Sequence, residues 1–372
     1  MVSQSIATPR QAAPAHLTQH RTPLPALTGI RFFAAMQVLF FHFGAGFAER
    51  HRAPAPIVTF LSNGWSAVTL FFLLSGFILS YTYVGQIEKQ GGKRRFWEAR
   101  FARIYPVYFL SLVLNWPFRG ALSPGLAVGV LGMVQAWNPL RVADAGAWNL
   151  TAWTLSTEAF FYVLFPFVLP LVEKLSTRAL RVFAVVVIFL VVLGHTMSLH
   201  YMEPIATLTF IPLPAFRFPE FLTGMILGLL FLRRERRTHH PWKLYTAALT
   251  IMAILAFIDG PWISVLFIPL AVLIYELALG GSILARLFGS KSLLLLGGAS
   301  YAIYLLQLPI RNWLHLFLVG AANDKGGIDA IVSPVVLVIF SIGVFLFWEE
   351  PARKWLRNRF KKLEAMRYAK PS

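Results

Sequence analysis

The stretch LTGIRFFAAMQVLFFHF at residues 27–43 decides the class of fold. Its only ionisable side chains are Arg31 and His42, and the apolar character continues to Phe47. A helix needs about 20 predominantly apolar residues to cross the hydrocarbon core of a bilayer. The stretch is therefore predicted to form a membrane-spanning helix.

The composition of the whole chain agrees with this prediction. Its 372 residues are 57% hydrophobic and 13% charged, with a mean hydropathy of +0.63. A soluble domain carries about 25% charged residues, because its surface faces water. We expect an all-α polytopic membrane helix bundle embedded in the lipid bilayer. The candidate segments are 27–47, 65–84, 101–118, 123–138, 152–172, 180–199, 215–232, 243–258, 262–279, 293–318 and 331–349.

The basic residues predict how these segments are oriented. A net charge of +18 would suggest a nucleic-acid partner in a soluble protein, but here the lysines and arginines lie between apolar runs. Loops rich in Lys and Arg stay in the cytoplasm, and 85–103, 233–243 and 351–372 are such segments. They share one side only if one candidate does not span, and the glycine-rich 123–138 is the weakest. We expect about ten transmembrane helices, one re-entrant or interfacial segment, and both termini in the cytoplasm.

The remaining organisation is simple. Residues 1–26 are rich in Pro, Ala, Thr and Gln and are predicted to be a disordered cytoplasmic tail. The transmembrane domain is expected at 27–350, followed by a basic cytoplasmic tail at 351–372. The chain has no cysteine, which excludes disulfides, thiolate metal sites and a cysteine nucleophile. We expect neither a metal ion nor a nucleic-acid partner.

Arg31 and His42 are ionisable groups inside a predicted span, where such groups are costly and tend to serve function. Eleven helical residues bring the later side chain to within about 20° of the earlier one, about 16 Å further along the axis. The alternative is that Arg31 reaches the headgroups and His42 the outer interface. We favour a passage along this face, through which a ligand enters from the cytosol and presents its reactive end to His42.

A second polar group follows in WNLTAWTLSTEAFFYVLFPF at 148–167. Trp153, Ser156 and Tyr162 are candidate substrate-binding residues in this stretch. Glu158 lies one to two turns inside the span without a basic neighbour in sequence, so it needs a partner from another helix. We expect that partner to be His42, because a carboxylate would fix the tautomer of the imidazole and raise its basicity.

Arg100 and Arg103 are three residues apart in RRFWEARFARIYPVYF at 94–109 and therefore share a helix face. Paired arginines suit phosphate groups, although plain retention of positive charge on the inner side would also explain them. Glu349 is expected to be a topological anchor, and His195 a satisfied core or interface histidine. The other intramembrane polar residues receive no role here: Glu220, Glu276, Gln307 and Arg311.

Together these stretches resemble the membrane-bound acyltransferase-3 family, which O-acylates extracytoplasmic glycans and some secondary metabolites. The resemblance covers about residues 27–360. It rests on the order of LTGIRFFAAMQVLFFHF, FFLLSGFILSY, RFWEARFARIYPVY, WTLSTEAFFYVLFPF, FRFPEFLTGMILG, GGASYAIYLLQLPI and EEPARKWLRNR.

The resemblance implies roles for several residues. Arg31 and His42 match the family's Arg-x10-His motif, in which the histidine is essential to transfer. Arg100 and Arg103 match an Arg-x-x-Arg element on the side from which acyl-coenzyme A approaches, and Ser156 and Glu158 match a Ser-x-Glu motif. Gln307 stands where members often have histidine, so the chemistry of this chain cannot require a histidine there.

We therefore expect an O-acyltransferase of the bacterial cytoplasmic membrane that uses acyl-coenzyme A, most simply acetyl-coenzyme A. His42 acts as a base or as an acyl carrier. The acceptor, a polysaccharide or a lipid-linked oligosaccharide, rests on family analogy alone. Acylation of a small metabolite such as a macrolide, a glycolipid transporter or flippase, and an inactive scaffold are the alternatives. The lack of a detectable internal repeat counts against a transporter.

Overall fold

The computed structural model describes residues 21–64, 66–201, 214–234, 240–258, 265–318 and 328–368. Every regular element in these ranges is a helix, which confirms the all-α prediction. The α-helices are α1 (Pro25–Phe43), α2 (Ala45–Arg50), α3 (Ala55–Ser62), α4 (Ser66–Tyr83), α5 (Gly92–Asn115), α6 (Pro124–Leu131), α7 (Trp153–Glu173), α8 (Thr177–Tyr201), α9 (Pro214–Leu232), α10 (Pro241–Phe257), α11 (Phe267–Leu279), α12 (Ile283–Phe288), α13 (Lys291–Leu318), α15 (Ser333–Val344) and α16 (Glu350–Tyr368). The 3₁₀ helices are η2 (Trp116–Phe118), η3 (Val142–Gly146) and η4 (Leu150–Ala152), and the π-helical segments are η7 (Ile328–Val332) and η8 (Phe345–Glu349).

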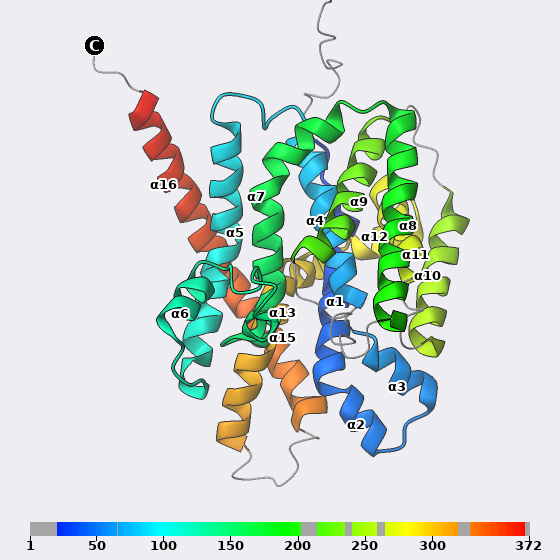
Figure 1. Ribbon diagram of the computed structural model, residues 1–372. Coiled ribbons are helices and arrows are strands. Elements are labelled where there is room, and N and C mark those ends of the chain that lie inside the picture. Colours follow the sequence, from blue (N-terminus) through cyan, green and yellow to red (C-terminus); the bar gives the residue numbers. More distant parts are fainter. Residues whose placement is uncertain are drawn as a thin grey trace, which may run out of the picture.

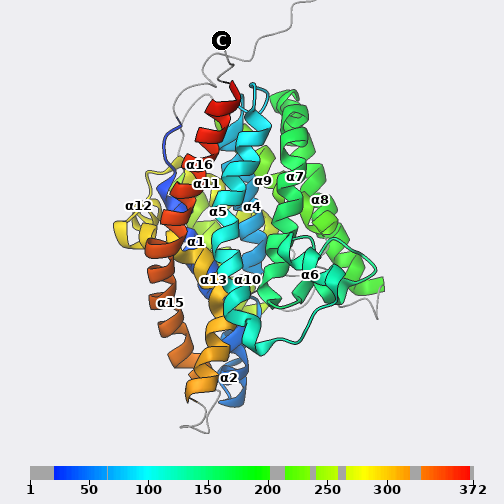
Figure 2. The ribbon, with the colours of Figure 1, turned by 90° about the vertical axis from the view of Figure 1, so that its left-hand side faces the viewer.

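The long helices run side by side in one bundle (Figures 1 and 2). In the described part of the chain, six segments are long and apolar enough to cross a membrane. They are Pro25–Phe43, Ser66–Tyr83, Leu150–Glu173, Pro214–Leu232, Lys291–Leu318 and Ile328–Arg367. The helices α10 and α11 are apolar but shorter. The chain is a multi-pass membrane protein.

The start of α1, the start of α5 and the end of α16 lie at the same end of the bundle, at the top of Figure 1. We call this the basic end, because the arginine- and lysine-rich stretches at 89–103 and 353–367 reach it. The short helices α2 and α3 lie at the opposite end.

Both ends of the expected transmembrane domain are joined to the bundle by contacts. Residues 21–24 pack against the bundle, since the Tyr81 hydroxyl donates a hydrogen bond of 2.9 Å to the Thr22 carbonyl oxygen. Residues 1–20 of the predicted tail lie outside the described residues. At the other end the chain stays helical from η8 into α16, which is joined to α5 by an ion pair of 2.9 Å between Glu364 and Arg95.

The segment that was expected not to cross the membrane contains α6, which is eight residues long. At 1.5 Å per residue such a helix covers about 12 Å, less than half of the bilayer core. The residues after α6 are tied to α7 through Ser156: its Oγ accepts a 3.0 Å hydrogen bond from the Ala136 amide, and its carbonyl accepts one of 2.8 Å from the Trp137 indole.

Small residues bring α4 and α9 into close contact. A Cβ atom on Gly224 would collide with the Leu73 carbonyl of α4, and a Cβ on Gly76 would collide with the Phe221 carbonyl of α9. Glycine lets two helix backbones approach in a membrane, where lipid offers no hydrophobic drive for helices to associate. This contact fixes the depth and rotation of α4, which forms one wall of the internal cavities described next.

Candidate active site

Two adjoining cavities lie among α1, α4, α7 and α13. Their shared wall residues are Arg31, Phe71, Glu158 and Tyr301. The larger, of about 100 Å³, also reaches Arg100 and Arg103 on α5. The smaller, of about 50 Å³, extends the other way to Thr154 and Tyr304. Arg31 and Glu158 therefore lie where the two cavities meet.

Glu158 accepts a hydrogen bond within α7 and shares the walls of both cavities with Arg31. The Tyr162 hydroxyl, one turn further along α7, donates a 3.1 Å hydrogen bond to Glu158 Oε2. The same hydroxyl lies 3.3 Å from the Ser75 Oγ of α4.

The expected pairing of Glu158 with His42 is wrong. Glu158 lines the same cavities as Arg31, and His42 is eleven residues further along α1, a rise of about 16 Å. From the sequence, the depth of Glu158 in the membrane can be predicted only from its position along α7. The tilt and offset of α7 relative to α1, which sequence does not reveal, place it at the level of Arg31.

Arg100 is the basic side chain best placed to receive a ligand. It lines the larger cavity, and its Cζ lies 5.9 Å from the centroid of the Tyr83 ring. Its Nε atom is buried and has no hydrogen-bond partner among the described residues. A buried donor without a partner is costly, so the position suits an incoming anionic or carbonyl oxygen.

Arg103 lines the same cavity but is already engaged. Its guanidinium forms an ion pair with Glu349, whose side chain is completely buried, and its Cζ lies 5.8 Å from the centroid of the Tyr301 ring. The expectation that Glu349 is a topological anchor at the membrane surface is therefore wrong. Glu349 is a buried partner that holds Arg103 at the cavity wall, although it remains at the end of the last apolar segment.

His42 shares the helix face of Arg31 but is not a wall of either cavity. Ala35 and Leu39, which lie between the two levels of α1, are fully buried. Neither cavity therefore extends from Arg31 to His42. Next to His42, the ring of Phe43 lies 5.5 Å from the Arg311 guanidinium of α13.

The other two predicted substrate contacts on α7 lie behind the cavity walls. Ser156 is fully buried and supports the segment after α6 through the two hydrogen bonds given above. Trp153 packs edge-on against Phe72, with ring centroids 6.4 Å apart, and Phe72 lines the smaller cavity. Of the three, Tyr162 alone lines one of these two cavities.

Tyr301 was not identified from the sequence, although it lines both cavities. Its hydroxyl donates a 2.8 Å hydrogen bond to the Ile104 carbonyl of α5. The available signal was a tyrosine hydroxyl in the middle of an apolar helix, shortly after Gly297. A Cβ on Gly297 would collide with the Thr28 carbonyl of α1, so this glycine brings α13 and Tyr301 close to α1.

The unassigned polar residues fall outside the cavities. Glu220 is buried and pairs with Arg217 at 3.0 Å, and the Thr69 hydroxyl donates to it at 3.2 Å. Gln307 donates a 2.7 Å hydrogen bond to the Tyr304 carbonyl of its own helix. Glu276 is buried, and the side chain of His195 lies outside the described residues.

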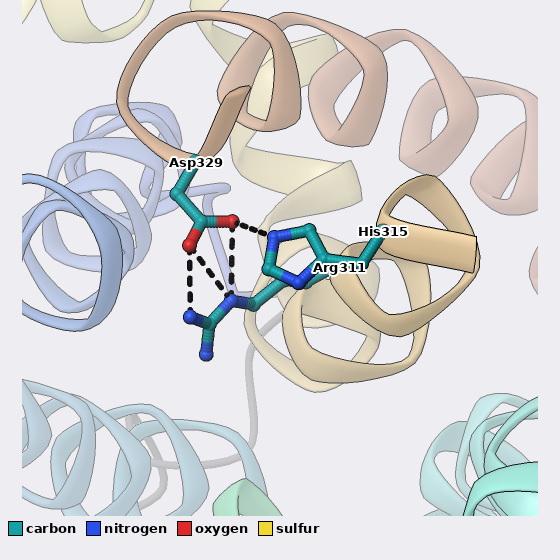
Figure 3. A network of polar contacts seen from close by, with 3 residues as sticks. All are labelled: Arg311, His315 and Asp329. Carbon is teal, nitrogen blue, oxygen red and sulfur yellow. Dashed lines mark hydrogen bonds and ion pairs between the residues drawn. The ribbon is translucent and has the colours of Figure 1, made fainter. Parts of the chain in front are cut away.

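Arg311 belongs to a network near the far end of α13 (Figure 3). Its Nε and one terminal nitrogen donate to both oxygens of Asp329 in η7, at 2.8–3.1 Å. His315 Nε2 lies 2.7 Å from Asp329 Oδ1. A bidentate Arg–carboxylate contact of this kind fixes the relative orientation of its two side chains. It therefore holds η7 against α13. Within the described residues there is no group of three or more His, Asp or Glu side chains that could hold a metal ion.

A multi-pass bundle that encloses buried arginines, a carboxylate and tyrosines around an internal cavity has the architecture of a membrane-embedded enzyme. Comparison with known proteins gives its family: the acyltransferase-3 model, described as an acyltransferase domain, matches residues 24–348. The chain belongs to this family and is a bacterial multi-pass membrane acyltransferase, which confirms the resemblance seen in the sequence.

Three relatives illustrate the similarity. The acyltransferase MdmB of Streptomyces mycarofaciens is 28% identical over 80% of this chain and 81% of MdmB. The O-acetyltransferase OatA of Staphylococcus aureus is 22% identical over 89% of this chain and 57% of OatA. YrhL of Bacillus subtilis, named as a candidate peptidoglycan O-acetyltransferase, is 26% identical over 79% of this chain and 50% of YrhL. The chain thus spans about half the length of OatA and YrhL. No solved structure matches the chain.

Proposed function

We propose that this acyltransferase moves an acyl group, most simply acetyl, from acyl-coenzyme A to a hydroxyl group, with His42 as the essential side chain. The main support for binding of the acyl donor is the pair of cavities around Arg31 and Glu158. At one end of these cavities, Arg100 has a buried Nε without a hydrogen-bond partner among the described residues. The O-acetyltransferase relatives support transfer to oxygen.

The size of the cavities limits which part of the donor they can hold. Pockets for drug-sized ligands measure about 300–1,000 Å³, whereas the two cavities have volumes of about 100 and 50 Å³. They suit the narrow pantetheine arm and the acyl group, not the nucleotide. In this proposal Arg100 and Arg103 bind the donor at the basic end of the larger cavity, and Arg31 and Glu158 contact the arm deeper inside.

To reach His42, the acyl group must move beyond the end that the smaller cavity has in this structure. The smaller cavity ends at Thr154 and Tyr304, and Tyr304 lies one turn before Gln307 on the helix that carries Arg311. We infer that donor binding separates α13 from α7 at this point and opens the remaining path. The donor stays bound in the inner half of the bundle, and its pantetheine arm extends along the opened path. The thioester at the end of this arm then lies beside His42.

At His42 two routes lead to the same products. As a base, the imidazole takes the proton of the acceptor hydroxyl while the oxygen attacks the thioester carbon. The carbon–sulfur bond breaks, and the imidazolium returns the proton to the departing thiolate. As an acyl carrier, the imidazole nitrogen attacks the thioester carbon, the carbon–sulfur bond breaks and the thiolate of coenzyme A leaves. The acceptor oxygen then attacks the acyl-imidazole carbon, the carbon–nitrogen bond breaks, and the hydroxyl proton goes to the thiolate, which leaves His42 free again. Both routes require His42 and neither requires a metal.

The proposed orientation has the basic end in the cytoplasm and ten spans in all. In addition to the six segments named above, these are α5, α8, α10 and α11. The charge bias of the loops supports this assignment. Donor entry is then from the cytosol, and His42 lies in the outer half of the membrane, where an extracytoplasmic acceptor can approach.

The acceptor proposed is a hydroxyl of a polysaccharide or a lipid-linked oligosaccharide. The name of YrhL refers to a glycan, which supports this choice. A small metabolite is the second candidate, because MdmB is the relative of similar length and its name specifies no glycan.

Replacement of His42 by alanine tests the proposal. Membranes with the His42→Ala protein are expected to transfer label from acetyl-coenzyme A to cell-envelope glycan at least about 100-fold more slowly than wild type, in line with the effect of a general base. His51 provides a matched control, because it is exposed and its contacts are with Phe47 of its own turn: the carbonyl at 2.9 Å and the ring, with centroids 4.0 Å apart. His51→Ala should keep the wild-type rate.

The chain has no cysteine, so release of coenzyme A can also be followed with a thiol reagent without background from the protein. Size-exclusion profiles in detergent establish that each variant is folded. Wild-type transfer by a folded His42→Ala protein would remove His42 from the mechanism, and would leave Glu158 as the remaining candidate base.

A further inference from the structure

An apolar groove lies on the face of α1 opposite Arg31. It has a volume of about 350 Å³, and α1, α4, α10, α11 and α12 form most of its walls. Its polar wall residues are Gln37 and Ser66, and both are satisfied by hydrogen bonds within the protein, to the carbonyls of Phe60 and Asn63 respectively. The other described side chains that line the groove are apolar, so its chemistry fits a hydrocarbon chain.

A second cavity, of about 430 Å³, lies at the basic end. The segment 22–26, the end of α9, the end of α11 and the helix α12 surround it. Among the described residues, its charged wall residues are Arg234 and Arg286, and none of its described wall residues is acidic. Arginine is the side chain best suited to phosphate oxygens. The cavity therefore fits an anionic group.

The helix α12 forms part of both sites. Ala285, Arg286 and Gly289 line the basic cavity, while Leu284 and Phe288, on the other side of the helix, line the apolar groove. Figure 2 shows α12 at the periphery of the bundle. Its remaining apolar side chains, Ile283 and Leu287, are exposed at 68% and 52%. A basic cavity that suits an anionic group and an apolar groove thus lie on the two sides of one short peripheral helix.

We propose that these two sites together bind one anionic phospholipid of the leaflet at the basic end, with its phosphate at Arg286 and Arg234 and an acyl chain in the groove. The dimensions agree with this assignment. The groove follows α1 from Ile30 to Phe40, a length of about 15 Å. One leaflet contributes about half of the 30 Å hydrocarbon core, so the groove has the length of one acyl chain.

This site is separate from the donor cavities, and its occupancy can be measured without enzyme activity. The wild-type protein is placed in nanodiscs of phosphatidylglycerol and, in parallel, of phosphatidylcholine. We expect a higher melting temperature in phosphatidylglycerol, and retained phosphatidylglycerol on the protein in native mass spectrometry. Arg286→Gln should lose at least half of the difference in melting temperature and bind phosphatidylglycerol about tenfold more weakly.

Two variants distinguish a specific lipid-binding site from non-specific electrostatic attraction to anionic lipid. Arg359→Gln removes a basic residue of α16 that is exposed and belongs to neither cavity, and it should behave as wild type. Ala248→Phe adds a ring at the wall of the groove and should reduce lipid retention while keeping the melting temperature in phosphatidylcholine. The proposal is overturned if Arg286→Gln and Arg359→Gln have equal effects, or if both lipids are retained equally by the wild type.

Discussion

Glu349 and Glu350 are neighbours in the chain but lie in different surroundings. The side chain of Glu349 is 0% exposed and pairs with Arg103 across the bundle. Glu350 pairs with Arg353 of its own helix, and both of these side chains reach solvent. Breaking a buried ion pair leaves one charge without compensation, whereas a surface pair contributes about 0–1 kcal/mol.

We therefore expect Glu349→Gln to destabilise the protein by about 3–5 kcal/mol, because the Arg103 guanidinium loses its counter-charge inside the bundle. Glu350→Gln is the matched control and should cost less than about 1 kcal/mol. Unfolding of both variants is compared by thermal and denaturant melting in the same detergent. Equal stability of the two variants would show that Arg103 finds another partner.

At the level of helices, α4 and α9 pack closely, with Gly76 and Gly224 against the carbonyls of the partner helix. Small residues in this arrangement replace the hydrophobic drive that soluble helices use. The position of α4 decides where Phe71 and Ser75 stand in the cavities around Arg31. A change in this contact should therefore affect stability and the donor site together.

Gly224→Val is expected to destabilise the bundle by about 1–3 kcal/mol or to prevent its assembly, because the new side chain collides with backbone that cannot move aside. Gly343→Val on α15 is the matched control, since a Cβ at that glycine meets nothing within 4 Å. The yield of monodisperse protein and its melting temperature provide the measurement. A normal yield of the Gly224 variant would mean that α4 and α9 can separate without loss of the fold.

At the level of the whole molecule, the described start of the chain and the end of α16 lie at one end of the bundle. The basic stretches lie at this end, and we propose that it faces the cytoplasm, because loops rich in Lys and Arg tend to stay there. The absence of cysteine from the entire sequence makes the orientation directly testable by single-cysteine labelling.

Two exposed positions at opposite ends serve this test. Leu140, in the loop between α6 and α7, is 91% exposed, and Asn358 is an exposed residue of α16. A membrane-impermeant maleimide added to intact cells should label Leu140→Cys but not Asn358→Cys, and lysis should make Asn358→Cys reactive. The reverse pattern would place the basic end outside and remove the proposed route for a cytosolic donor.

Sequence alone was sufficient for everything that depends on local composition. The apolar runs predicted the helices, and the order of the motifs identified the family. Within 123–138, which was expected not to cross, the helix α6 has only eight residues. Arg100 and Arg103 line the same cavity, as their predicted common helix face requires. Residues three apart in a helix share a face. These properties depend on neighbours in the chain.

The partners of the buried charges were decided only by the tertiary structure. Glu158 lies at the level of Arg31 and not of His42, and Glu349 pairs with Arg103, which is far from it in sequence. Helical periodicity gives the direction of a side chain around its own axis but not the depth, tilt or neighbour of the helix. Those are set by close contacts between helices, such as the glycines of α4 and α9, and a shift of one helical turn, about 5.4 Å, is enough to exchange one ionic partner for another.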